Sequence, residues 1–221
     1  PDTLYRAEVS SFSNFSSLSG SSVTMLTQAS LTGLTANNTY YARVRAKSHQ
    51  GVQTDYALLG STVTKAFIPI PAASTYTFVS ISNLAFQWQA NNNPSDTIYI
   101  AEISSFSNFS PITGASQTIL TQAEFTGLFF NTSYYARVRA QNRESVQTDN
   151  LILSSTATLA AVPATAVSTY TFVAISSLTF QWQANNNPSD TIYIAEISSF
   201  SDFSLLSGSL TTLLTEVTMT G

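Results

Sequence analysis

The chain has 221 residues, which is enough for one or two domains with their own cores. Only 9% of the residues are charged, the formal net charge is −4, and no basic run exists, which argues against a nucleic-acid partner and against an anionic membrane surface. No apolar run is long enough for membrane insertion. Cysteine is absent, which excludes disulfides and thiol chemistry. The uncharged, hydroxyl-rich polar residues favour an extracellular or cell-surface location.

An internal repeat organises the whole sequence. The stretch FQWQANNNPSDTIYIAEISSFS occurs unchanged at 86–107 and at 180–201, and Trp88 and Trp182 therefore lie 94 residues apart. A period of this length suits one small domain per copy, joined head to tail. We divide the chain into a partial first repeat (1–67), a complete middle repeat (68–160) and a partial third repeat (161–221), and we expect it to be a segment of a longer array.

The pattern within one copy predicts strands and no helices. Alternation by two in 84–90 indicates a half-buried strand, followed by the turn-forming residues 91–96 and a second strand over 97–103. Further short strands are predicted at 116–121, 123–128, 133–140 and 150–159. Pro69, Pro71 and Pro163 are placed at the joints between copies, where a missing N–H does least harm. This arrangement is typical of an all-β sandwich.

One motif in each copy resembles a known family. Residues 127–140, GLFFNTSYYARVRA, resemble the L-x-x-x-T-x-Y-x-x-x-V-x-A pattern of fibronectin type III domains. The matching residues are Leu128, Thr132, Tyr134, Val138 and Ala140 in the middle repeat and Leu34, Asn38, Tyr40, Val44 and Ala46 in the first, with Trp88 and Trp182 at the strand-B tryptophan. The family's usual proline after the leucine is absent, because Phe130 and Ala36 occupy that position.

The resemblance implies tandem immunoglobulin-like β-sandwich domains of about 94 residues, each with an A-B-E sheet and a C′-C-F-G sheet. It implies that Tyr40 and Tyr134 form the tyrosine corner of each domain, with the hydroxyl bonded to upstream backbone. Together with Leu34, Leu128, Trp88 and Trp182 they make up the structural core. The resemblance also places the chain in a large extracellular or cell-surface repeat protein of bacterial type.

No catalytic, cofactor or metal site is expected. The single histidine, His49, has Arg143 as its counterpart one period later, so the position is not maintained within the chain. The carboxylates of the middle repeat are Asp96, Glu102, Glu124, Glu144 and Asp149, and they do not form a calcium-loop motif. Asn14, Asn37, Asn108 and Asn131 lie in N-x-[ST] sequons, which carry glycans only in a host with that pathway.

The outer face of the second predicted sheet is the candidate binding surface. If Tyr134, Ala136 and Val138 point inward, strand phase turns Ile98, Ile100 and Tyr135 outward as an apolar strip, repeated at Ile192 and Ile194. Glu102 then faces Arg137 or Arg139 on the neighbouring strand, and we interpret this as an ordinary exposed pair contributing roughly 0.2–1 kcal/mol. The strip would contact a neighbouring repeat, an identical chain or a ligand.

These features favour a non-catalytic structural segment, an extended spacer or filament of head-to-tail sandwich domains whose partners are neighbouring repeats or identical chains. One alternative is an adhesin or receptor ectodomain that binds a surface protein or a glycan through its loops or its apolar strip. Another is an ancillary spacer in a secreted glycan-degrading enzyme, whose catalytic domain would lie elsewhere in the parent chain.

Overall fold

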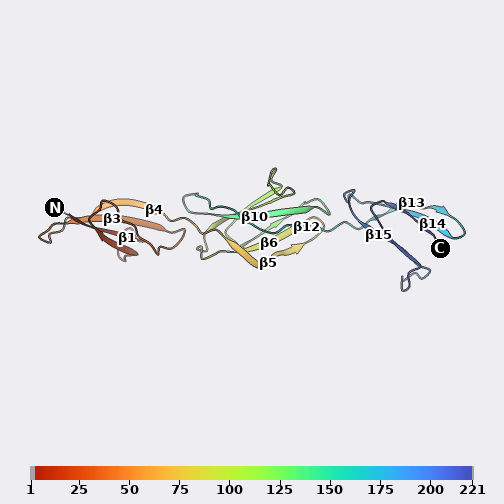
Figure 1. Cartoon of the computed structure of the whole chain (residues 1–221), viewed down its shortest axis with the longest axis horizontal. Helices are drawn as coiled ribbons and strands as arrows, with labels where there is room; N and C mark the ends of the chain where they lie inside the picture. Colours follow the sequence, from red (N-terminus) through yellow and green to blue (C-terminus); the bar gives the residue numbers. More distant parts are fainter. Residues whose placement is uncertain (1–2, 221) are drawn as a thin grey trace.

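The computed structural model describes residues 3–220, so Pro1, Asp2 and Gly221, which begin and end the predicted repeats, lie outside it. Three β-rich units follow one another in an elongated row, with the N-terminus at one end and the C-terminus near the other (Figure 1). The described residues contain strands and no helices, and hence no helix long and apolar enough to span a membrane.

The strands are β1 (Leu4–Ser10), β2 (Gly20–Thr24), β3 (Thr39–Lys47) and β4 (Ala57–Val63) in the first repeat; β5 (Ile70–Val79), β6 (Leu84–Gln89), β7 (Ile98–Ser104), β8 (Gly114–Thr118), β9 (Gln122–Phe125), β10 (Ser133–Gln141), β11 (Leu151–Ile152) and β12 (Thr156–Ala157) in the middle repeat; and β13 (Ala164–Val173), β14 (Ser177–Gln183), β15 (Tyr193–Ile197), β16 (Gly208–Thr212) and β17 (Glu216–Thr220) in the third.

The middle repeat is a two-sheet sandwich. One sheet has the order β5-β6-β9 and the other the order β11-β10-β7-β8, with β12 also paired to β10. All of these pairings are antiparallel. The order matches the A-B-E and C′-C-F-G sheets expected for fibronectin type III. The fold is therefore all-β, built of tandem immunoglobulin-like repeats of about 94 residues.

The core of the middle repeat follows directly from alternation by two. Leu84, Phe86 and Trp88 of β6 are 0–3% exposed, whereas Gln87 between them is only half-buried. From the opposite sheet, Tyr99 of β7 packs edge-on against Trp88, with ring centres 5.6 Å apart. A small-residue strand, β10, brings the two sheets together because Ala136 and Ala140 are fully buried. Apolar side chains from both sheets thus fill one contiguous core.

The first and third repeats each contain part of this arrangement. The first forms a single sheet of order β2-β1-β3-β4, whose members correspond in turn to β8, β7, β10 and the β11–β12 segment of the middle repeat. The third forms a β13-β14-β17 sheet and a separate β15-β16 hairpin. Among the described residues, only the middle repeat has two extended sheets packed face to face.

Several strand boundaries differ from the predicted ones. The segment predicted as one strand over 150–159 forms two short strands, β11 and β12, and the strands predicted at 116–121 and 123–128 are the shorter β8 and β9. Pro71 lies inside β5 rather than at a joint. It is tolerated there because β5 is an edge strand of its sheet and has a bulge after Pro71.

The two predicted tyrosine corners are present. The hydroxyl of Tyr40 accepts a hydrogen bond from the Thr35 backbone N–H at 2.9 Å, and that of Tyr134 accepts one from the Phe129 N–H at 3.1 Å. Both tyrosine side chains are buried. Each corner fixes the turn that precedes β3 or β10, which we call the E–F turn (residues 35–38 and 129–132).

We predict that Tyr134→Phe lowers the free energy of unfolding of the middle repeat by about 0.5–1.5 kcal/mol, because the Phe129 N–H loses the hydrogen bond that the buried Tyr134 hydroxyl accepts. Urea unfolding followed by tryptophan fluorescence measures the change. Tyr135→Phe, on the opposite face of β10, is the matched control and should leave the unfolding midpoint in place. Equal midpoints for the two variants would contradict this role for the corner.

A second tyrosine joins the two sheets along one side of the sandwich. The Tyr76 hydroxyl, from β5, donates a hydrogen bond to the backbone carbonyl of Ser154. Burial raises the pKa of Tyr76 from 10.0 to about 12. The folded state therefore holds this proton more tightly than the unfolded chain does.

It follows that stability of the middle repeat should fall as pH rises from 10 toward 12, the interval between the unfolded and folded pKa values of Tyr76. Below pH 10 this contribution is fully present. Urea midpoints measured across this range should fall less steeply for Tyr76→Phe than for the unchanged chain. Identical slopes would show that Tyr76 does not cause the alkaline loss.

Candidate functional site: the outer sheet face and the repeat junctions

A buried glutamate lies at the centre of the outer face of the β7–β10 sheet. Glu102 pairs in register with Arg137, and its side chain also contacts Arg139. Arg137 Nε donates to Glu102 Oε2 at 2.7 Å, while Arg139 donates to both carboxylate oxygens at 2.9 and 3.0 Å. Glu102 is only 8% exposed. All of its carboxylate oxygens are thus held by charged donors.

The first repeat forms the same kind of cluster with a different second arginine. Glu8, 2% exposed, binds Arg43 Nε at 2.8 Å and Arg6 Nε at 2.7 Å. Arg43 is the counterpart of Arg137, but Arg6 comes from β1 itself, at the position that Ile100 occupies in the middle repeat. The second arginine therefore comes from the glutamate's own strand in the first repeat and from the neighbouring strand in the middle repeat. The glutamate has two guanidinium partners in both repeats.

A phenylalanine in a strained conformation covers each cluster. The guanidinium carbon of Arg137 lies 4.3 Å from the centre of the Phe109 ring, and that of Arg43 lies 4.2 Å from the Phe15 ring. Phe109 and Phe15 have φ values of 56° and 55°, a left-handed backbone that a bulky residue adopts at a cost of about 1–2 kcal/mol. Cation–π contact and burial of the ring offset this strain.

The clusters correct the expectation of an exposed pair. Burial acts to raise the pKa of Glu102, but the hydrogen bonds from Arg139 and Arg137, together with their charges, outweigh it and hold the pKa below 4.5. For Glu8, burial again opposes the hydrogen bonds from Arg43 and Tyr56 and the charges of Arg43 and Arg6, and the pKa is also lowered. Two arginines and an aromatic ring exclude water from a face that strand phase alone predicts to be exposed.

The predicted apolar strip is divided by this cluster. Ile98 and Ile100 lie on the outer face as expected and are half-buried, but they pair with Gln141 and Arg139. Tyr135 pairs with Ser104, at the other end of the ladder. Glu102 and its arginines lie between the two apolar groups. In the third repeat Ile192 and Ile194 are 66% and 69% exposed. An interface through these isoleucines remains a prediction.

Most of the predicted core residues are buried. Trp88, Tyr40, Tyr134 and Leu128 are at most 7% exposed. Leu34, in the segment before β3, and Trp182 of β14 are only partly buried, because the repeats that contain them lack the full opposing layer that covers Trp88.

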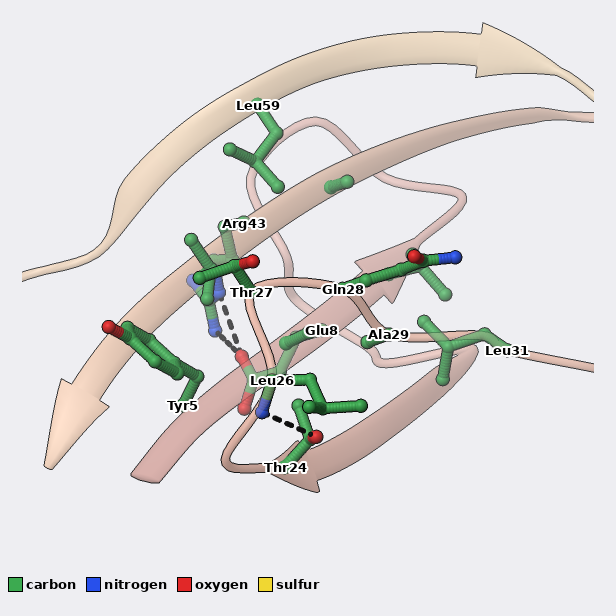
Figure 2. A pocket seen from close by; sticks show the side chains of 14 residues that line it. Tyr5, Glu8, Thr24, Leu26, Thr27, Gln28, Ala29, Leu31, Arg43 and Leu59 are labelled. Atoms are coloured by element: carbon green, nitrogen blue, oxygen red, sulfur yellow. Dashed lines mark hydrogen bonds and ion pairs between the residues drawn. The ribbon is translucent and has the colours of Figure 1, made fainter. Parts of the chain in front are cut away.

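The inner face of the first-repeat sheet borders an apolar hollow of about 370 Å³. Tyr5, Leu26, Leu31 and Leu59 surround it, while Glu8 and Arg43 point toward each other (Figure 2). In the middle repeat the equivalent face is covered by β6 and β9. The hollow therefore has the lining of a sandwich core and carries no free catalytic group.

The titratable side chains among residues 3–220 include no cluster of metal ligands. His49 is exposed, and no group of three His, Asp or Glu side chains in this range could hold a metal ion. The carboxylates with the closest contacts, Glu8 and Glu102, are held by arginine and are unavailable as general bases.

The linkers between repeats are attached at both ends. On the side of the first repeat, the Thr64 N–H donates to the Asn38 carbonyl at 3.0 Å and the Asn37 N–H donates to the Lys65 carbonyl at 3.1 Å. On the side of the middle repeat, the Asn93 side chain both accepts from the Phe67 N–H at 2.7 Å and donates to the Phe67 carbonyl at 2.8 Å. Only Ala66 lies between the two attachments.

The second linker repeats these contacts. Thr158 and Leu159 bind the E–F turn through backbone hydrogen bonds to Thr132 and Asn131, each 3.1 Å long. Asn187 binds both backbone groups of Ala161 at 2.7 Å. Asn91 and Asn185 add a bond of 2.9 Å to the next carbonyl in each linker, that of Ile68 or Val162. The asparagines belong to the turn between β6 and β7 or between β14 and β15, which we call the B–C turn (residues 91–97 and 185–191).

The role of the B–C turn was not recognised in the sequence. The available signal was its invariance, since NNNPSD is identical in two repeats whereas the linkers it binds read KAFIP and LAAVP. Asparagine amides that bind backbone groups do not depend on the linker side chains, so the turn is constant and the linker is free to vary.

Comparison with known proteins gives limited similarity. No protein-family model matches the chain, and no curated protein matches it. Among solved structures, the chicken CNTN1 FN1–FN3 domains are 14% identical, with a TM-score of 0.38, covering 72% of this chain and 56% of that one. A computationally redesigned β-sandwich protein is 16% identical, with a TM-score of 0.33, covering 42% of this chain and 90% of that one. The fold assignment above rests on the strand pairing itself.

We predict that Glu102→Gln lowers the free energy of unfolding by about 2 kcal/mol at neutral pH, because hydrogen bonds to charged groups are worth about 1.5–3 kcal/mol each and two arginines lose their counter-charge. The carboxylate contribution is fully present above pH 4.5, the unfolded value, and is lost as pH falls through the lower folded pKa. Urea midpoints from neutral to acidic pH measure both effects.

Glu124→Gln is the matched control for this variant, because Glu124 is exposed on β9 in the other sheet of the same repeat. It should leave the midpoint and its acid dependence close to those of the unchanged chain. If Glu102→Gln behaves like Glu124→Gln, the buried cluster makes no net contribution.

Proposed function

We propose that this chain is a non-catalytic structural segment, a stiff extended spacer of sandwich repeats in an extracellular or cell-surface protein. The observation that carries the proposal is the linker. One residue, Ala66 or Ala160, separates the last backbone bond to the preceding E–F turn from the first bond to the following B–C turn.

A linker of one unattached residue leaves few backbone dihedrals free to rotate. Flexible linkers gain reach and bending freedom with length, whereas this one is bound along its backbone on both sides. Ala66 also packs against the core of the middle repeat. The row of units in Figure 1 is therefore maintained by specific contacts, as a spacer requires.

The surface supports an extracellular setting for such a spacer. It is poor in charged groups and rich in hydroxyl and amide groups, and the chain has no cysteine whose redox state the compartment would control. Strand order of the fibronectin type III kind is compatible with this role.

Small-angle X-ray scattering on the monomeric chain tests the proposal. We expect the pair-distance distribution of a rod, with one set of repeat orientations fitting the profile. Insertion of Gly-Ser-Gly-Ser after Ala66 and after Ala160 should convert it to that of a flexible chain. The same insertion after Ser107, an exposed loop position within the middle repeat, is the control. A profile for the unchanged chain that already requires many orientations, or a compact one, would refute the spacer.

A further inference from the structure

Each junction also contains a contact away from the linker, centred on one asparagine of the E–F turn, Asn37 or Asn131. The side chain of Asn37, in the E–F turn of the first repeat, is 1% exposed. Its Nδ2 donates to Thr97 Oγ1 of the middle repeat at 2.9 Å, and its Oδ1 accepts the backbone N–H of Arg143 at 2.9 Å. Both polar atoms of a first-repeat side chain are thus satisfied by residues of the next repeat.

The same contact recurs one period later. Asn131 Nδ2 donates to Thr191 Oγ1 at 2.9 Å, the distance found at the first junction. Asn37 and Asn131 have φ values of 47° and 42°, a conformation that asparagine tolerates better than most residues. The strained turn and its partner threonine are therefore both maintained at the 94-residue period.

These contacts differ in effect from the linker attachment. The linker attachment restrains bending, but it runs along one chain segment, and its few free dihedrals do not by themselves set the rotation of one unit about the long axis relative to the next. A second contact between the E–F turn of one repeat and the B–C and F–G turns of the next fixes that rotation. Because the buried amide of Asn37 has no water to replace a lost partner, rotation would leave its polar atoms unsatisfied and is therefore disfavoured.

We infer that the N-terminal end of each repeat is a self-recognition surface whose partner is the E–F asparagine of an identical preceding repeat, and that this pairing sets the rotation between neighbours. In the middle repeat this surface consists of Thr97 Oγ1, which accepts from the asparagine, and the Arg143 N–H, which donates to it. In the third repeat it includes Thr191 Oγ1. The inference builds on the proposed spacer function and adds a fixed twist per repeat to it.

The surface accounts for two further observations. The F–G turn, residues 142–147, differs in sequence from its counterpart in the first repeat, yet it uses a backbone N–H for this contact, so its side chain at 143 is free to vary. Asn37 and Asn131 also lie in sequons. With both amides hydrogen-bonded across a junction, these two asparagines are structural, and a glycan on Asn37 would separate the repeats.

The absence of native cysteine allows spin labels to be placed in pairs and measured by double electron–electron resonance. Ser13, Ser107 and Ser201 are exposed, occupy equivalent positions one period apart, and lie outside the E–F, F–G and B–C turns that form the junction contacts. We expect the Ser13→Cys/Ser107→Cys pair and the Ser107→Cys/Ser201→Cys pair to give narrow distributions with the same mean distance.

Single substitutions then test the contribution of each junction to its own distance distribution. Asn37→Ala should broaden the first distribution alone and Asn131→Ala the second alone, so that each junction is the control for the other. Thr97→Val, which keeps the β-branched shape, should reproduce the effect of Asn37→Ala without altering the E–F turn. Circular dichroism confirms that each variant is folded.

Three results would overturn the inference: broad distributions in the unchanged chain, unchanged widths in the asparagine variants, or broadening of both distances by either substitution. A wrong inference about fixed rotation gives a different set of results from a wrong proposal about the spacer function. Loss of a fixed rotation leaves an elongated scattering profile, whereas loss of the spacer function appears as a compact or many-orientation profile whatever the spin-label widths.

Discussion

The arrangement of the repeats depends on one interaction, the hydrogen bonding of asparagine amides to backbone groups of the linker. Asn93 and Asn187 each use both a donor and an acceptor on one linker residue, as a neighbouring strand would. Such a bond requires no particular side chain in the linker. It also satisfies backbone groups that would otherwise be partly buried at the joint without partners. Sequence variation in the linker and constancy of the turn follow from this chemistry.

The rest of the repeat holds that turn in place. β6 and β7 enter and leave it, and their inward residues Trp88 and Tyr99 pack against each other in the core. On the outer face, Glu102 and its arginines bind β7 to β10, so the strand that follows the turn is held on both faces. The sandwich therefore acts as a rigid support for its end turns, and those turns carry the contacts between repeats.

Sequence was sufficient for the features that depend on local pattern. Alternation by two predicted β6, β7 and β10 and the facing of Glu102 toward Arg137, and the Tyr134 motif predicted its corner. Burial of Glu102 was missed, because it depends on Phe109 adopting a positive φ beneath Arg137. The contact of Asn37 with Thr97 was missed because it joins positions 60 residues apart through the relative placement of two repeats. Only the unexplained invariance of NNNPSD pointed to it.

Rigid attachment of the repeats to one another is the central claim, and nuclear spin relaxation of the backbone amides of the monomeric chain tests it most directly. If the junctions hold, the amides of all three repeats fit a single, strongly anisotropic rotational diffusion tensor, and the relaxation rates depend on bond orientation relative to one long axis. Separate, faster correlation times for the individual repeats would contradict the account, because they would show that the asparagine contacts do not hold neighbouring repeats together in solution.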